Sequence, residues 1–162
     1  MAKENLRYLV LTALLAALCA VGGLVKIPVS ATASAALDSA PALLAAFVLP
    51  PVLAGFTGAL GHMATAMSSG MPFGALHFIV AFEMFFIILV FAHLHKKGFH
   101  KLKWAWMLIA NGVLAAVPFY FLISPAFYIA AVPGLVLATA INIAVAFVCV
   151  PALQRVKKMV KS

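Results

Sequence analysis

Residues 104–154 read WAWMLIANGVLAAVPFYFLISPAFYIAAVPGLVLATAINIAVAFVCVPALQ and contain no ionised side chain. An uncharged apolar run of this length is typical of membrane-spanning helices, each of which needs about 20 apolar residues. Basic clusters border the run on both sides: Lys96, Lys97, Lys101 and Lys103 before it, and Arg155, Lys157, Lys158 and Lys161 after it. Short loops rich in Lys and Arg stay in the cytoplasm. The run therefore returns to the side it left, and two spans fit its length.

The preceding residues, 8–95, follow a basic start at Lys3 and Arg7 and contain only three charged side chains: Lys26, Asp38 and Glu83. The chain of 162 residues is 67% hydrophobic and 9% charged, which predicts one all-α integral membrane domain over residues 1–162 and no soluble domain. Its net charge of +8 is explained by cytoplasmic loops that meet anionic lipid. A nucleic-acid partner is not expected, because no basic face interleaved with aromatic residues is present.

We expect six transmembrane helices, with the N- and C-termini both in the cytoplasm. Turn-forming residues separate the apolar runs, most clearly at Pro50-Pro51 and in residues 68–74. The predicted spans cover residues 8–25, 39–50, 51–67, 75–95, 104–123 and 133–151. The second span is shorter than the usual ~20 residues, so it must begin earlier, tilt, or be sheltered by its neighbours.

Four intramembrane polar side chains fall at similar depth below the predicted outer loops, which are residues 26–38, 68–74 and 124–132: His62, Glu83, Asn111 and Asn142. Glu83 lies about eight residues below the outer end of its span, or roughly 12 Å at ~1.5 Å per residue. A carboxylate inside the membrane costs about 2.5–3.5 kcal/mol even on insertion scales. Glu83 is therefore the first candidate for a ligand site. The alternative is a structural pair with His62, or a protonated acid that bonds a neighbouring helix.

Further candidates lie near the predicted outer loops. His77 lies one turn below the second loop and is either a ligand contact or an interface residue. Asp38 is placed to cap the helix that begins at Ser39, and it is also a candidate ligand contact. Tyr120 and Tyr128 flank the third loop, where aromatic residues either anchor the interface or stack on a planar ligand.

Two of these candidates could instead have a purely structural role, and a metal site is not expected. Asn111 and Asn142 serve equally well as interhelical hydrogen-bonding residues. A metal site or other cofactor is not expected, because His77 and Glu83 are six residues apart, on different helix faces, and no HExxH-type spacing occurs.

Small residues recur at helical spacing in the first predicted helix: Ala13 and Ala17, and Ala16 and Ala20. Gly55, Gly58 and Gly61 form a similar series in the third. Faces of this kind let helices pack closely. They either pack within this chain or dock another membrane protein.

These segments resemble the substrate-binding S components of energy-coupling factor (ECF) vitamin transporters. The resemblance covers the whole chain and is clearest at 11–17 (LTALLAA), 37–42 (LDSAPA), 55–62 (GFTGALGH) and 69–74 (SGMPFG). It implies a non-enzymatic subunit of a bacterial cell membrane. Such a subunit binds a vitamin-like molecule under its outer loops and works with a transmembrane coupling (T) subunit and two ATPase subunits. It also implies that Ala13 and Ala17, with Ala16 and Ala20, dock the coupling subunit.

The run around Asp38 and His62 most resembles the subgroup associated with the cobalamin precursor α-ribazole. Thiamine, pyridoxine or another small ring would suit these residues nearly as well, although both Trp residues lie on the wrong side for thiamine. Two other functions remain open. One is a proton-coupled carrier in which Glu83 titrates, and the other is a membrane enzyme that uses Glu83 and His62 as acid and base.

Overall fold

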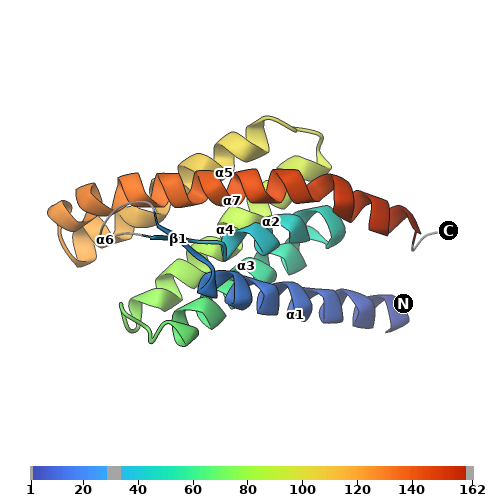
Figure 1. Cartoon of the computed structure of the whole chain (residues 1–162), viewed down its shortest axis with the longest axis horizontal. Coiled ribbons are helices and arrows are strands. Elements are labelled where there is room, and N and C mark those ends of the chain that lie inside the picture. The colour runs from blue at the N-terminus through green and yellow to red at the C-terminus, as the bar shows by residue number, and fades with distance from the viewer. Residues whose placement is uncertain (1, 29–33, 160–162) are drawn as a thin grey trace.

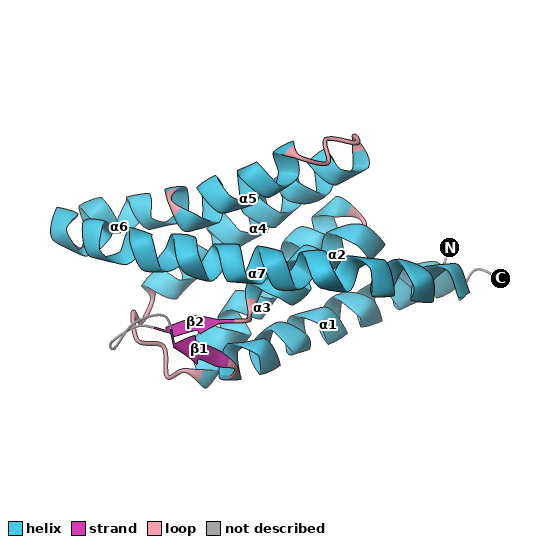
Figure 2. Ribbon diagram, turned by 45° about the horizontal axis from the view of Figure 1, so that its top comes forward, coloured by secondary structure: helices cyan, strands magenta, loops and turns pink. Residues whose placement is uncertain are grey.

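The computed structural model describes residues 2–28 and 34–159 and is almost entirely helical. Figures 1 and 2 show an elongated bundle. A small antiparallel hairpin of β1 (Lys26–Pro28) and β2 (Ser34–Ala36) follows the first helix. The helices are α1 (Ala2–Leu24), α2 (Ser39–Val48), α3 (Pro51–Ser68), α4 (Leu76–Lys96), α5 (Leu102–Gly112), α6 (Val117–Leu122) and α7 (Pro125–Met159), with a 3₁₀ turn η1 (Leu114–Ala116) between α5 and α6.

Four helical stretches of the described chain are long and apolar enough to cross a membrane: Glu4–Leu24, Leu76–Lys96, Leu102–Leu122 and Pro125–Arg155. Large apolar side chains on their outer faces are exposed, among them Leu14, Phe82 and Phe147. Exposed apolar faces on several sides of one bundle are what lipid contact requires. The chain is thus a multi-pass helical membrane protein, as the sequence predicts.

The short helix α2 lies inside the bundle rather than against lipid. It packs against α1, α3, α4 and α7, and its Leu43 and Ala45 are fully buried. A helix covered by protein does not need the length of a lipid-facing span. Shelter by neighbouring helices is therefore the reason that this segment can be short.

Two predicted outer loops have regular structure instead. Residues 26–38 contain the β1–β2 hairpin, in which Ile27 pairs with Ala35. Residues 124–132 were expected as a loop, but α7 already begins at Pro125 and runs through Pro133. A proline inside a membrane helix is tolerated because neighbouring helices and local adjustments satisfy the backbone groups that it frees.

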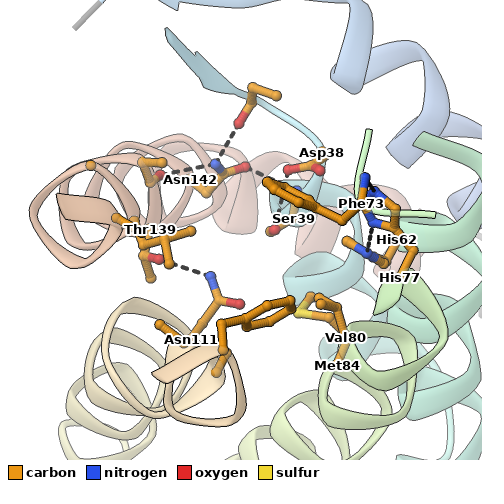
Figure 3. Close-up of a pocket in the computed structure, with 18 of the residues that line it drawn as sticks. Asp38, Ser39, His62, Phe73, His77, Val80, Met84, Asn111, Thr139 and Asn142 are labelled. Carbon is orange, nitrogen blue, oxygen red and sulfur yellow. Dashed lines mark hydrogen bonds between the residues drawn. The ribbon is translucent and has the colours of Figure 1, made fainter. Parts of the chain in front are cut away.

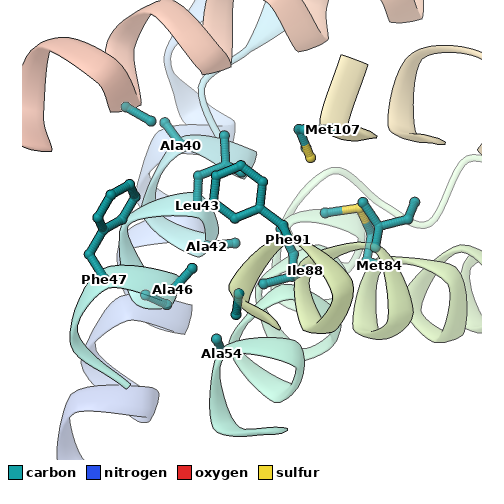
Figure 4. Close-up of a cluster of buried hydrophobic side chains, with 14 of the residues drawn as sticks. Ala40, Ala42, Leu43, Ala46, Phe47, Ala54, Met84, Ile88, Phe91 and Met107 are labelled. Carbon is teal, nitrogen blue, oxygen red and sulfur yellow. The ribbon is translucent and has the colours of Figure 1, made fainter. Parts of the chain in front are cut away.

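The core lies where α2 faces α4 and α5, around the fully buried Leu43, Ile88, Phe91 and Met107 (Figure 4). Helix α3 packs on both α1 and α4 through its glycines. A Cβ at Gly61 would lie 2.6 Å from the Cβ of Cys19 on α1, and one at Gly58 would lie 2.8 Å from Ile88 on α4. The glycine series of α3 therefore serves packing within this chain.

Both termini lie at the same end of the bundle, and the α4–α5 turn lies toward that end (Figures 1 and 2). The hairpin and α6 both lie toward the opposite end. The described parts of the basic clusters thus gather at the end that holds the termini, and one of their side chains is buried there. Lys103 is 3% exposed, and its Nζ lies 3.0 Å from His95 Nδ1 and 4.4 Å from the centre of the Phe47 ring.

Candidate functional site

A cavity of about 400 Å³ lies at the hairpin end of the bundle. This volume is within the range of about 300–1,000 Å³ that is usual for small-molecule sites. Six helices (α2 to α7), the 3₁₀ turn, the end of β2 and the α3–α4 loop contribute to its wall (Figure 3). The lining residues are Ala36, Asp38, Ser39, His62, Phe73, His77, Val80, Met84, Asn111, Ala115, Ala116, Phe119, Phe127, Ala131, Gly134, Leu135, Ala138, Thr139 and Asn142.

Asn142 of α7 holds one side of the cavity together. Its Oδ1 accepts hydrogen bonds from the backbone N–H groups of Ser39 (3.1 Å) and Ala40 (2.8 Å), the first two residues of α2. Its Nδ2 donates to the carbonyls of Ala36 (2.7 Å) and Ala138 (2.9 Å). An Asn side chain has two donors and two acceptor positions, so all four are in use. Asn142 shapes the wall and has no hydrogen-bonding position left for a ligand.

The expected capping role of Asp38 is wrong. Asp38 stands at the N-cap position of α2 but makes no side-chain cap hydrogen bond, and its backbone is helical (φ −80°, ψ −27°). A capping side chain normally has a non-helical backbone and accepts from the first-turn amides, and here Asn142 accepts from two of those amides. The cap comes from Asn142 of α7, which leaves the Asp38 carboxylate to line the cavity.

The Asp38 carboxylate is half-buried and has no ionic partner among the described residues. Its Oδ1 accepts a hydrogen bond from the Ser39 hydroxyl at 3.3 Å. Burial raises the pKa of Asp38 above its ordinary value, and the hydrogen bond from Ser39 opposes that shift. Asp38 is therefore the acidic group that faces the cavity, and a donor or a cation in the cavity would stabilise its ionised form.

His62 of α3 and His77 of α4 form a hydrogen-bonded pair, with His62 Nε2 3.1 Å from His77 Nδ1. The Phe73 N–H donates to the other nitrogen of the second ring, His77 Nε2, at 3.4 Å. An imidazole nitrogen that accepts a hydrogen bond carries no proton. His77 is therefore neutral with its proton on Nδ1, which donates to His62 Nε2, and His62 in turn is neutral with its proton on Nδ1.

Aromatic rings close the cavity beside this pair. Phe73 in the α3–α4 loop contacts Phe119 of α6 and Phe127 of α7, with ring centres 6.2 Å and 5.7 Å away. The backbone at Gly70, Met71 and Gly74 has positive φ, a conformation in which glycine is free of steric cost. The tight loop SGMPFG thus directs Phe73 back over the site.

Asn111 and Thr139 form the remaining polar part of the wall. Asn111 Nδ2 donates to Thr139 Oγ1 at 2.8 Å, and this bond joins α5 to α7. Thr139 is fully buried, and Asn111 is partly buried. Only one of the four hydrogen-bonding positions of Asn111 is used in this contact, so the amide remains able to bond a ligand.

The structure brings together five of the eight ligand-site candidates: Asp38, His62, His77, Asn111 and Asn142. Glu83 does not line the cavity, although Val80 and Met84 of the same helix do. Glu83 Oε2 is buried with no hydrogen-bond partner among the described residues. Tyr120 and Tyr128 line a separate shallow hollow of about 260 Å³ with Val117 and Phe121.

Sequence reasoning missed Thr139 and most of the apolar wall. Thr139 precedes Asn142 by three residues, a spacing that places both on one helix face, so this signal was available. The contribution of Phe73 depends on how its loop folds back, and helical spacing gives no information on that. No group of three or more His, Cys, Asp or Glu residues within the described ranges is arranged to hold a metal ion.

The small residues of α1 divide between two faces. Ala13 and Ala17 are exposed, Ala16 is buried against the bundle, and Ala20 is half-buried. Leu14 and Leu18, which follow the exposed alanines, are also exposed. The outward face of α1 therefore combines small residues with large apolar neighbours.

A family model described as "ECF transporter, substrate-specific component" matches residues 7–154. Neither the curated proteins nor the solved structures contain a significant match to the chain.

Proposed function

The chain belongs to the family of ECF transporter substrate-specific components, and we propose that it is the solute-binding subunit of an ATP-driven importer for a vitamin or vitamin precursor. Members of this family are transport subunits that associate with a T subunit and ATPase subunits. The observation that carries the proposal is the ligand-sized cavity between Asp38, the histidine pair and the aromatic cover of Phe73, Phe119 and Phe127.

The proposed substrate is α-ribazole, a benzimidazole nucleoside. Its flat ring would lie against the rings of Phe119 and Phe127, since aromatic groups stack in offset or edge-to-face arrangements. Its ribose hydroxyls would meet Asp38 and Asn111, whose carboxylate and amide bond hydroxyl groups. The cavity supports a small ring with polar substituents, and α-ribazole is the member of that class that the sequence resemblance favours.

We propose six membrane crossings, with both termini and the α4–α5 turn in the cytoplasm of a bacterial cell and the cavity opening outward. The positions of both termini at the basic end support this orientation. Ala13 and Ala17 would then contact the T subunit, because they are exposed. Ala16 would not, since it is buried in the bundle.

Ligand binding by the purified subunit tests the proposal. Calorimetric titration with α-ribazole, and then with thiamine and pyridoxine, is expected to give saturable binding. Phe127→Ala should weaken that binding by about tenfold or more, through loss of one aromatic contact worth ~1.4 kcal/mol. Phe121→Ala is the control, because this nearby side chain is 78% exposed.

The same preparation distinguishes the rival functions. Proteoliposomes that contain only this subunit should not concentrate the ligand, and the bound ligand should be released chemically unchanged. Uncoupler-sensitive uptake without ATPase subunits would instead indicate a proton-coupled carrier. Product formation would indicate an enzyme.

A further inference from the structure

The cavity has an unbalanced set of charges. None of the described residues that line it is Lys or Arg, whereas one of them, Asp38, is an acid. The basic residue nearest in sequence to Asp38 is Lys26, which is exposed and does not line the cavity. An anion that enters would therefore meet a like charge and no opposite one.

The two histidines do not supply the missing positive charge. A protonated His77 would carry hydrogens on both ring nitrogens, but its Nε2 accepts from the Phe73 N–H, and its Nδ1 faces His62 Nε2. Protonation would break one contact that holds the Phe73 loop in place. The hydrogen bonds of this pair are therefore those of two neutral rings.

Backbone donors at this end of the cavity are also occupied. The start of a helix is a common anion site because its first N–H groups are free. In α2 the N–H groups of Ser39 and Ala40 are bonded to Asn142 Oδ1. The arrangement that would most easily receive a phosphate or carboxylate is closed by the chain itself.

From these three observations we propose that the cavity selects by charge: it takes uncharged or cationic ring compounds and rejects their phosphorylated or carboxylated forms, with Asp38 as the residue that sets this preference. The proposal rests on the proposed function and narrows its substrate class. The importer would take up a nucleoside or free vitamin, and a phosphorylation step needed for its use would follow entry.

A test that needs no knowledge of the ligand measures the charge preference of the cavity directly. Ala131→Cys places a thiol in the wall, and Ser69→Cys places one in the exposed α3–α4 loop, both in a Cys149→Ser background with Cys19 left buried. Each is treated with cationic trimethylammonioethyl and anionic sulfonatoethyl methanethiosulfonate. The ratio of cation rate to anion rate should be at least about tenfold higher at position 131, because a partly desolvated charge acts strongly at short range.

Asp38→Asn should bring the rate ratios at positions 131 and 69 to within about threefold of each other. Glu4→Gln is the control: it makes the same carboxylate-to-amide change near the start of α1, and it should leave the difference between the two ratios intact. Equal ratios in the parent protein would overturn the inference. A preference that survives Asp38→Asn would also overturn it.

Matched ligand pairs connect this result to transport. α-Ribazole and its phosphate, thiamine and its monophosphate, and pyridoxine and its phosphate are compared by thermal shift of the purified subunit. The unphosphorylated member of any binding pair should raise the melting temperature, and stronger binding by a phosphorylated member overturns the charge inference while the proposed function stands. If no vitamin-like compound binds, the proposed function fails, and the thiol rates still decide the charge preference.

Discussion

Asn142 is the residue on which the cavity most depends, because it bonds three separate backbone segments at once. Replacing it with Leu would leave the Ser39 and Ala40 N–H groups of α2 without partners. A buried polar group without a partner costs about 1–3 kcal/mol. We expect Asn142→Leu to destabilise the protein by about 2–4 kcal/mol and to lower the melting temperature in detergent by roughly 5–15 °C.

Asn111→Leu is the comparison for this prediction. Asn111 makes one side-chain hydrogen bond, to Thr139, so its loss should lower the melting temperature less and weaken ligand binding more. Equal melting temperatures for the two variants would show that Asn142 does not hold α2 in place.

Asp38 gives a pH-dependent prediction. The pKa of Asp38 is raised in the folded state. Between the unfolded and the folded pKa, the folded protein therefore binds more protons than the unfolded chain. Stability then falls as pH rises from the unfolded value, about 3.9, through the folded pKa. The melting temperature of ligand-free Asp38→Asn should therefore rise relative to that of the parent protein as pH increases from about 4 towards the raised folded pKa of Asp38. Parallel melting curves across this range would contradict the prediction.

How far a residue's role can be predicted depends on the distance of its partner. The polarity and depth of His62, Asn111 and Asn142 indicated the layer of the site, since helical rise converts sequence position into depth. The cap of α2 could not be predicted, because its acceptor lies 103 residues away and a suitable local residue, Asp38, was present. Glu83 was ranked first on its depth and on the cost of a carboxylate inside the membrane, but it does not line the cavity.

At the scale of elements, apolar length predicted the helices better than it predicted their ends. The second span is short, and its burial among four helices explains why. The early start of α7 at Pro125 was missed because Pro133 resembles a helix start. In a helix that continues, the carbonyl four residues earlier simply goes without its usual bond.

The outward face of α1 gives a prediction at this scale. Ala13→Trp should block co-purification with the T subunit, because a bulky side chain prevents close helix approach, and it should leave ligand affinity unchanged. Ala105→Trp, an exposed alanine on α5, is the matched control and should co-purify normally. If both variants retain the complex, α1 is not the docking element.

At the scale of the whole molecule, the basic clusters predict the orientation. Ser69 directly follows α3 and Lys97 directly follows α4, and both positions are exposed. Each is replaced with Cys in turn. In intact cells, a membrane-impermeant maleimide should label position 69, whereas position 97 should react only after permeabilisation. The reverse pattern would place the cavity on the cytoplasmic side and contradict the proposed importer.

The bond between Asn142 and the start of α2 also sets an order of events during synthesis. The 103 residues between Ser39 and Asn142 take roughly 5–20 s to translate at about 5–20 residues per second. Until Asn142 has been made, α2 lacks its cap, and the site does not yet exist. A chain that ends before α7 would never gain this cap. The unpaired N–H groups of Ser39 and Ala40 would then give cellular quality control a permanent feature to recognise.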